Sequence, residues 1–508
     1  MLKSSMYRSL LLLLISVTPI CAQEPTASPA PPDKGLSHGS GATVLEQPST
    51  PPANAKNGYL LSPNPDAAVL PKPSVKLDPA HEYTLPELID IAEREHQETR
   101  VAWQLARNAA LAAGFAQSTY LPRVTANIVG GYQDSTGNVG TGRFTVSGTG
   151  SAAGTVSAIS LEWLLFDFGG RANVVSAAKK LAQASNITFT GVHQKVIHGV
   201  CIAYYALLAA RQRVRTNEQA LANALELQNA AEARYSGGVG TLLESSQARQ
   251  VRAQIQLATI QAEGMERDTY ATLLAAMGLS PLEKIRIAPF EHRRLPPEIL
   301  TPVEQVVKDA LACRPDVLAA YAAEQASQAS VKAAEALYRP KIFLAGTGAY
   351  ASGQLGLTAL PSIGDQLPTL NISGNQWSSA VLVGLTIPVF DGKRREDVIQ
   401  QAKNNTVKAA ATLDRIRIDA IQEIVAAQNA LRTSIAANQA AEVLQEAAKT
   451  TYDAALDSYK QGVVSITSVI EAETQLLQAN LATDDAYNSA LSAAATLAFS
   501  TGSLGASP

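Results

Sequence analysis

The chain carries the same pattern twice, and each copy combines helix-like and strand-like sequence. One group of residues recurs 218 positions later and a second group recurs 224 positions later. The first group pairs Glu98/Asp316, Trp103/Tyr321, Ala116/Ala334, Tyr120/Tyr338, Pro122/Pro340 and Tyr132/Tyr350. The second pairs Phe166/Phe390, Asp167/Asp391, Arg171/Arg395, Tyr235/Tyr459, Gly238/Gly462 and Gly278/Gly502. A six-residue length difference between the Gly/Ser/Thr-rich stretches 133–165 and 351–389 explains the change of offset. The sequence therefore predicts an internal duplication with a loop of variable length.

The N-terminal residues predict export from the cytoplasm. Basic residues precede an apolar run at 10–17, and the helix breaker Pro19 follows. This is the pattern of a secretory signal peptide, expected to span residues 1–22 with cleavage after Ala22. The apolar run is shorter than the roughly 20 residues that a membrane-spanning helix needs. Cys21 leaves lipid attachment as an alternative.

Composition narrows the classes of protein to which the mature chain can belong. Residues 23–80 contain twelve of the 26 prolines and predict a disordered, Pro-rich leader, most simply an inert spacer. The formal charge of −3 gives no footprint for nucleic acid. No run of about 18 apolar residues follows the signal, which excludes a helical membrane protein. Cys201 and Cys313 stand at non-equivalent positions and are expected to be small buried side chains rather than a disulfide.

The placement of proline predicts long helices. No proline occurs between Pro122 and Pro281, or between Pro388 and Pro508, and a proline inside a helix costs about 3 kcal/mol or more. Helices are expected at about 171–235 and 394–460, each roughly 100 Å long. Their small, alanine-rich faces favour close lateral packing with partner helices.

Each long helix is expected to end at a glycine-centred turn and fold back. The turns are residues 235–241 and 459–465, and glycine suits the left-handed conformation at a helix C-terminus. Thr241 and Ser465 are expected to cap return helices at about 241–277 and 466–500 by accepting free N–H groups. Each repeat therefore predicts a helical hairpin, at about 170–277 and 393–501.

Alternating sequence predicts two membrane strands in each repeat. The first repeat, residues 81–295, has them at about 120–133 and 154–167; the second, residues 296–505, at about 338–351 and 378–391. In residues 155–167 every second side chain can face lipid while Glu162 faces the other way. Four strands cannot close a barrel, because open edges do not persist in lipid and small barrels need about eight strands. The sequence thus requires several chains to share one barrel.

These features, in this order and twice, resemble the TolC family of outer-membrane factors over residues 82–502. The resemblance rests on Tyr-Leu-Pro and Tyr-Arg-Pro before the strands, Arg314-Pro315-Asp316, both Phe-Asp pairs and both Tyr-x-x-Gly turns. It implies an α+β membrane protein of the Gram-negative outer membrane that reaches into the periplasm. A homotrimer would form a long-helix α-barrel continuous with a twelve-stranded β-barrel, four strands per chain. The number three comes only from the resemblance.

The resemblance also implies a function and partners. It indicates the exit duct of a tripartite efflux pump, or alternatively of type I protein secretion, working with a periplasmic adaptor and an inner-membrane pump of RND, MFS or ABC type. The hairpin tips would dock the adaptor; their residues are Tyr235, Gly238, Val239, Thr241, Tyr459, Gly462, Val463 and Ser465. The alternative is that the glycines only terminate helices and take no part in docking.

Two further groups of residues follow from the resemblance. The periplasmic gate is assigned to Glu244, Tyr459, Ser468 and Glu471, unless the glutamates are simply solvated. Val464 stands where some members place a locking arginine, which favours a mouth held by Tyr459 packing or by backbone contacts. The strand-to-helix passage is assigned to Asp167, Gly169, Asp391 and Gly392, with Asp as a helix cap and Gly as a bend.

Catalysis has little support in the sequence. The six histidines include no His-Glu-x-x-His pattern, and no phosphate-binding loop is present, so neither an enzyme nor a cofactor is predicted. A soluble periplasmic helical scaffold remains the alternative from another class. The apolar faces of the predicted strands argue against it, because a soluble scaffold needs no lipid-facing band.

Overall fold

The computed structural model describes residues 73–141, 144–289, 294–296, 302–353, 357–360, 369–372 and 376–505. The predicted signal peptide 1–22, Cys21 and the leader as far as residue 72 lie outside the described residues.

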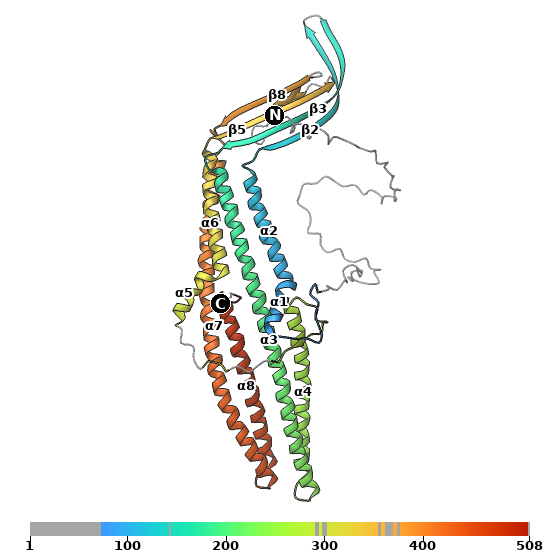
Figure 1. Cartoon of the computed structure of the whole chain (residues 1–508), viewed down its shortest axis with the longest axis vertical. Helices are drawn as coiled ribbons and strands as arrows, with labels where there is room; N and C mark the ends of the chain where they lie inside the picture. Colours follow the sequence, from blue (N-terminus) through green and yellow to red (C-terminus); the bar gives the residue numbers. More distant parts are fainter. Residues whose placement is uncertain are drawn as a thin grey trace, which may run out of the picture. The chain divides into compact units, whose positions relative to one another are not determined.

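The elements of the first half come in the order strand, helices, strands, long helices, strand (Figure 1). They are β1 (Glu82–Tyr83), α1 (Leu85–Glu95), α2 (Gln97–Ser118), β2 (Arg123–Thr141), β3 (Phe144–Phe166), α3 (Gly170–Ser236), α4 (Leu242–Ala276) and β4 (Arg286–Ile287). The second half follows a closely similar order. It comprises α5 (Val303–Cys313), α6 (Pro315–Glu335), a 3₁₀ turn (Ala336–Tyr338), β5 (Lys341–Gly353), β6 (Leu357–Leu360), β7 (Thr369–Ile372), β8 (Gln376–Thr386), α7 (Arg394–Lys460) and α8 (Ile466–Ser500).

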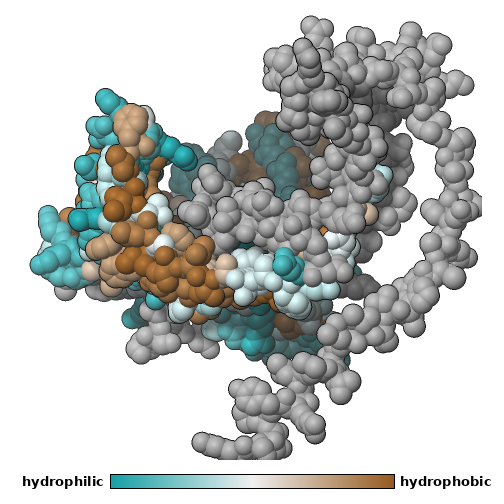
Figure 2. All heavy atoms as spheres, turned by 90° about the horizontal axis from the view of Figure 1, so that it is seen from above, coloured by the Kyte–Doolittle hydropathy of each residue, from teal (hydrophilic) through white to brown (hydrophobic). Residues whose placement is uncertain are grey.

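The main sheet is antiparallel, with the strand order β2-β3-β5-β8. In the described part of β3, Thr155 and Ile159 are exposed while Val156 and Ala158 are buried, which is the predicted alternation. Val156 and Ala158 form a small core with alanines of β5. The opposite set and the valines of β8 leave apolar surface exposed. From above, apolar side chains gather in a band on the end of the molecule that carries the sheet (Figure 2).

The strand boundaries differ from the predicted ones. β2 begins at Arg123 rather than near 120, because the chain leaves α2 through a turn in which Leu121 N donates to Ser118 O. Beyond residue 133, where a loop was expected, β2 and β3 continue as paired strands as far as Thr141 and Phe144. In the second half β5 and β8 span 341–353 and 376–386, and the short pair β6–β7 lies in the expected loop. The prediction of loops throughout these Gly/Ser/Thr-rich stretches was wrong. Strands pair through backbone groups, so the pairing tolerates these residues.

The two long helices have the same length. α3 and α7 each contain 67 residues, and their limits lie within a residue of the predicted 171–235 and 394–460. They turn back into α4 and α8, of 35 residues each. Many of the buried positions in these helices are alanines, such as Ala220, Ala224 and Ala231 in α3.

Each long helix has a pair of shorter helices placed end to end beside it. The pair α2 and α4 lies beside α3, and the pair α6 and α8 lies beside α7. The helices α6 and α8 also pack against α3, α6 against its first part and α8 further along. Where α4 ends, α2 begins; where α8 ends, α6 begins. At the first junction Gly278 adopts φ +76° beside the backbone of His96, which caps α2. At the second, Gly502 adopts φ +71° beside Arg314, the residue before α6.

Arg314 joins three helices at the second junction. Its side chain is 8% exposed, and Nη1 donates to Ser500 O at 2.8 Å, at the end of α8. Nη2 lies 2.6 Å from Asp316 and 2.7 Å from Glu423 of α7. A buried guanidinium is stable only when its donors are satisfied, so Arg314-Pro315-Asp316 serves as the link between α6, α7 and α8.

The two described cysteines differ in environment. Cys201 is buried in α3, as predicted, and burial raises its thiol pKa to about 11. The prediction for Cys313 was wrong: it is exposed, because only Ala310 of α5 is buried.

Among the described helices, none has a stretch long and apolar enough to cross a membrane.

Gly278→Ala should destabilise the protein, because a Cβ at this left-handed position would lie 2.8 Å from His96 Cα. We expect the free energy of unfolding to fall by about 1–3 kcal/mol. Gly264→Ala is the matched control: Gly264 lies inside α4 with nothing within 4 Å of an added Cβ, so this change should stabilise by up to about 1 kcal/mol. Thermal unfolding followed by circular dichroism measures both, and equal melting temperatures would contradict the junction argument.

Candidate functional site

The ends of the two helical hairpins have the same backbone geometry. Gly238 and Gly462 adopt φ of +74° and +80°, the left-handed conformation expected after a helix. In each turn the following residue bonds back to the helix: Val239 N donates to Arg234 O and Val463 N to Ser458 O. Val239 and Val463 are 71% and 75% exposed. Each tip therefore presents an apolar side chain on a rigid glycine turn.

The return helices begin differently in the two hairpins. Thr241 Oγ1 accepts from Glu244 N at 3.2 Å, and Glu244 Oε2 accepts from Thr241 N at 3.2 Å. Thr241 thus caps α4 as predicted, in a reciprocal capping box. The prediction for Ser465 was wrong, because its side chain caps no N–H of α8 and lies instead near the Ser468 and Thr467 hydroxyls. Ser468 stands where the first hairpin has Glu244, so no carboxylate returns to complete the box.

Arg234 ties the first hairpin to the second. Its guanidinium lies 5.0 Å from the centre of the Tyr459 ring, and Nη1 donates to Tyr459 O at 3.3 Å. Tyr459 is fully buried, in a cluster that combines Leu227 and Ala231 of α3 with side chains of α7 and α8. A cation over an aromatic face that also binds the backbone holds the two tips together.

The predicted gate residues differ in their relation to this contact. Burial raises the pKa of the Tyr459 hydroxyl, and the negative charge of Glu244 raises it further, whereas Arg234 acts in the opposite direction. Ser468 and Glu471 lie on exposed positions of α8. Tyr235 is 48% exposed at the first tip. The structure thus brings Tyr459 together with Glu244 and leaves Glu471 in solvent, within the one chain.

Two polar groups of this region were missed in the sequence. Arg234 precedes the predicted turn by one residue and was overlooked because its partner lies 225 residues away. Glu473 is 2% exposed in α8, where it follows Val469 and Ala472 and precedes Leu476 and Ala479 in the buried stripe. That helical spacing was visible in the sequence, and a carboxylate inside an apolar stripe was the available signal.

The strand-to-helix passage of the first half is built around Asp167 and Arg171. Asp167 Oδ2 accepts from Arg171 N at 2.6 Å, so the carboxylate caps the start of α3. The Arg171 side chain is 11% exposed and donates to three carbonyls, those of Thr119, Leu164 and Leu165. It also lies 4.9 Å from the centre of the Tyr120 ring. One guanidinium thus connects the end of α2, the end of β3 and the start of α3.

The second half repeats this arrangement. Asp391 Oδ2 accepts from Arg395 N at 3.2 Å and from Arg395 Nε at 2.6 Å, Arg395 Nη1 donates to Pro388 O, and Arg395 lies over the Tyr338 ring. Two successive residues before each long helix have positive φ: Phe168 and Gly169, then Gly392 and Lys393. Glycine was predicted at the bend, but each half uses it at only one of the two positions. The other is strained and held by the surrounding contacts.

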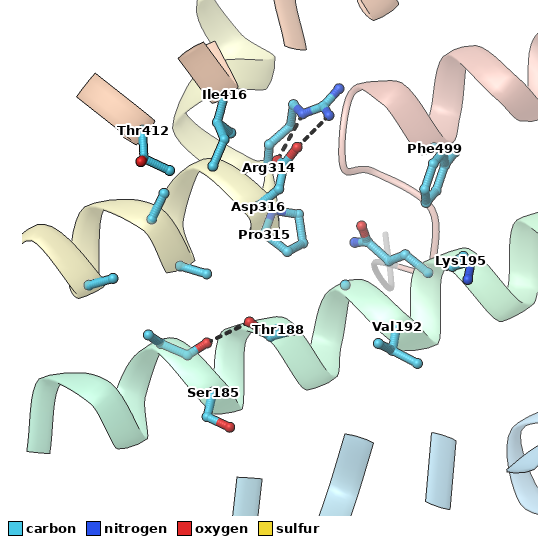
Figure 3. A pocket seen from close by; sticks show the side chains of 16 residues that line it. Ser185, Thr188, Val192, Lys195, Arg314, Pro315, Asp316, Thr412, Ile416 and Phe499 are labelled. Atoms are coloured by element: carbon cyan, nitrogen blue, oxygen red, sulfur yellow. Dashed lines mark hydrogen bonds and ion pairs between the residues drawn. The ribbon is translucent and has the colours of Figure 1, made fainter. Parts of the chain in front are cut away.

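A cavity of about 580 Å³ lies where α3, α6, α7 and α8 meet (Figure 3). Most of the surface of its wall is apolar, and the ion pair of Arg314 and Asp316 lies at its edge. Because Arg314 already binds three partners, the pair serves the helix junction. Among the described residues, no group of three or more His, Cys, Asp or Glu side chains is placed to hold a metal ion.

Comparison with known proteins identifies the class of protein. The model of the outer membrane efflux protein family matches residues 88–279 and 306–503. The chain belongs to this family. The predicted resemblance to TolC-type outer-membrane factors is confirmed. Its members are efflux and export channels of the Gram-negative outer membrane, a class of transport proteins and not of enzymes.

Curated relatives match most of the chain. Protein CyaE of Bordetella pertussis is 26% identical over 446 residues, covering 87% of this chain and 88% of the relative. Outer membrane efflux protein BepC of Brucella suis is 27% identical over 390 residues, covering 76% and 78%. The CmeC outer membrane channel of Campylobacter jejuni has a similar fold, with a TM-score of 0.69 at 20% identity over 82% of this chain and 85% of that one.

Arg171→Ala should destabilise this outer membrane efflux protein, because it leaves three carbonyls at the passage without their donor. We expect a loss of about 2–4 kcal/mol in the free energy of unfolding. Arg415→Ala is the control, since Arg415 forms an exposed pair with Asp419 in α7 and should cost about 0.5 kcal/mol or less. Denaturant unfolding measures the difference, and similar values for both variants would refute a special role for Arg171.

Proposed function

We propose that three copies of this chain form the outer-membrane exit duct of a tripartite efflux pump. Four strands from each copy would close a twelve-stranded barrel, and the helices of the duplicated hairpins would close a tube that reaches into the periplasm. The observation that carries the proposal is that the sheet and the row of helices within one chain both end in open edges.

In the part of the chain that the structure describes, the sheet and the row of helices each end in an element with a neighbour on one side only. The sheet leaves β2 and β8 at its edges. The helices near the sheet form the row α2-α3-α6-α7, which leaves α2 and α7 at its ends. Exposed strand edges are not tolerated in lipid. An interface between the β2 side of one copy and the β8 side of the next would close both layers at once. Such head-to-tail contacts generate a ring.

Exposed apolar side chains on the end helices support this closure. On α2, Val101, Leu105, Leu111 and Phe115 are 58–78% exposed. On α7, Val407 and Ile418 are 70% and 66% exposed. Apolar groups of this size on facing edges favour burial between copies. Each copy would thus supply one α2 face and one α7 face to its neighbours.

The hairpin tips suit an adaptor protein in the periplasm. The adaptor-docking surface would comprise the glycine turns with Tyr235, Val239, Thr241, Val463 and Ser465, and the exposed Val side chains offer apolar contact. Tyr459, also predicted for this surface, is fully buried and would not contact the adaptor. The duct has no energy source of its own, so an inner-membrane transporter must supply it. The relative BepC carries the name of an efflux protein, which supports this function.

The closed mouth would be held by the contact between Arg234 and Tyr459. Val464 stands where some members of the family place a locking arginine. The cation that would lock the mouth is therefore Arg234 of the first hairpin rather than a residue of the second. The carboxylates of Glu244 and Glu471, together with Ser468, would line the mouth when three copies assemble. A ring of carboxylates in a narrow pore concentrates cations.

Protein extracted from outer membranes should run as a trimer and conduct ions in a planar lipid bilayer. We expect a small, cation-selective conductance that increases severalfold in Arg234→Ala, because the tips lose their connection. The control is Arg249→Ala, which breaks an exposed ion pair with Glu232 between α3 and α4 of one hairpin and leaves the hairpins joined.

A soluble product without conductance would overturn the duct. A conducting trimer in which both variants behave like the wild type would retain the duct and reject the lock.

Replacing Gly238 and Gly462 by Val should abolish export while leaving the trimer intact, because β-branched residues fit poorly at positive φ. The Asn double variant is the matched control: Asn tolerates the left-handed conformation, and an added Cβ meets nothing closer than 3.4 Å at either position. Accumulation of ethidium by cells that depend on this protein measures export. Equal accumulation in Val and Asn variants would contradict docking through the turn geometry.

A further inference from the structure

Glu473 lies at the packing interface between the two hairpins. The residue is 2% exposed on α8. Both carboxylate oxygens accept from Asn223 Nδ2 of α3, at 3.4 and 3.3 Å. Gln219 Nε2 donates to Asn223 Oδ1 at 3.1 Å, which turns the amide N–H groups toward the carboxylate. Tyr452 of α7, 5% exposed, lies beside it. Three helices from both hairpins therefore meet at one buried acid.

No cation neutralises this acid: in the part of the chain that the structure describes, no ion pair involves Glu473. The charged groups of the surrounding helices are engaged elsewhere. Glu226 of α3 pairs with Lys460 of α7 at 2.7 Å, and on α4 Arg249 and Arg252 bind Glu232 and Gln228. Asp453 of α7 and Glu471 of α8 are exposed. A buried carboxylate without a counter-charge is costly when ionised.

We propose that Glu473 is a proton-controlled latch between the hairpins: protonated, it lets α8 pack against α3, and ionised, it favours their separation. The latch regulates the mouth described under the proposed function and rests on that function for its physiological role. Its physical basis is independent of transport, because it concerns only the packing of α3, α7 and α8.

The direction of the pH effect follows from burial. Burial raises the pKa of Glu473 from 4.5 to about 7, although the hydrogen bonds from Asn223 and the nearby hydroxyl of Tyr452 lower it in part. The packed state therefore holds the proton more tightly than the separated state. Packing is favoured fully below pH 4.5 and weakens as the pH rises to about 7, by up to about tenfold per pH unit and about 300-fold in all for each protomer.

Two neighbouring groups, Tyr452 and Lys460, have pKa values that are shifted away from this window. Burial and the negative charges of Glu473 and Glu226 raise the pKa of Tyr452, which stays neutral. The pKa of Lys460 is raised by its hydrogen bond to Glu226. His198 has a pKa lowered by burial, but it contacts Thr496 and Phe499 at the other end of α8. Among the described groups near the two hairpin turns whose pKa values are shifted, Glu473 is the one brought into the range between pH 5 and 8.

Amide hydrogen exchange of the full-length protein in detergent tests the latch. Peptides covering 219–227 of α3 and 469–477 of α8 are compared between wild type and Glu473→Gln at the same pH, so that intrinsic exchange rates cancel. At pH 8.0 the variant should exchange up to about 300-fold more slowly, and at pH 5.5 only about tenfold more slowly. Glu446→Gln, at an exposed position of α7, should match the wild type at both pH values.

Asn223→Leu provides a second variant that does not depend on Glu473→Gln. The donor favours the ionised carboxylate in the packed state, so removing it should make the same peptides lose more protection than in wild type above pH 7 and change them little below pH 5.5. Loss of packing alone would lower protection by the same factor at every pH. Equal exchange of wild type and Glu473→Gln at pH 8.0, or an Asn223→Leu profile that differs from the wild type by the same factor at every pH, would overturn the latch. Neither measurement involves conductance or export, so a failure of the duct remains distinguishable from a failure of the latch.

Discussion

The length of α3 and α7 is the constraint on which the rest of the structure depends. A helix of 67 residues is roughly 100 Å long and gains its stability from packing along its whole length. The chain meets this requirement with two shorter helices placed end to end beside each long one. Gly278 at His96 and Gly502 at Arg314 are the places where one partner stops and the next begins. The passages at Arg171 and Arg395 then connect both long helices rigidly to the sheet.

The architecture was readable in the sequence because its rules are local. Proline-free windows permitted the long helices, and Gly238 and Gly462 marked the turns into the return helices. Alternation in residues 155–160 gave the face of β3. The strand ends were less predictable, since pairing of β2 with β3 beyond residue 133 is decided by the partner strand and not by the Gly- and Ser-rich sequence itself. Cys313 was misjudged because its exposure depends on how little of α5 is buried.

The chemistry of the tips depends on contacts between distant parts of the sequence. Thr241 and Glu244 are three residues apart, so their capping box follows a known local pattern. Arg234 and Tyr459 are 225 residues apart, and nothing local marks the arginine as the partner of that ring. The same holds for Asn223 and Glu473, whose contact requires both hairpins to be in place. The duplication predicted equivalent positions in the two halves but not which cross-contacts would join them.

The composition of the helix interface explains how a few polar contacts could control the proposed mouth. Alanine buries little surface, and apolar burial contributes about 25 cal/mol per Å², so an alanine-rich interface between the hairpins gives modest attraction per turn. Compared with that attraction, the stacking of Arg234 on Tyr459 and the charge of Glu473 make large contributions to the free energy of packing. A bulkier seam of leucine would hold the hairpins together regardless of either group. The small side chains that allow close packing thus also make the packing reversible, as the proposed opening of the mouth requires.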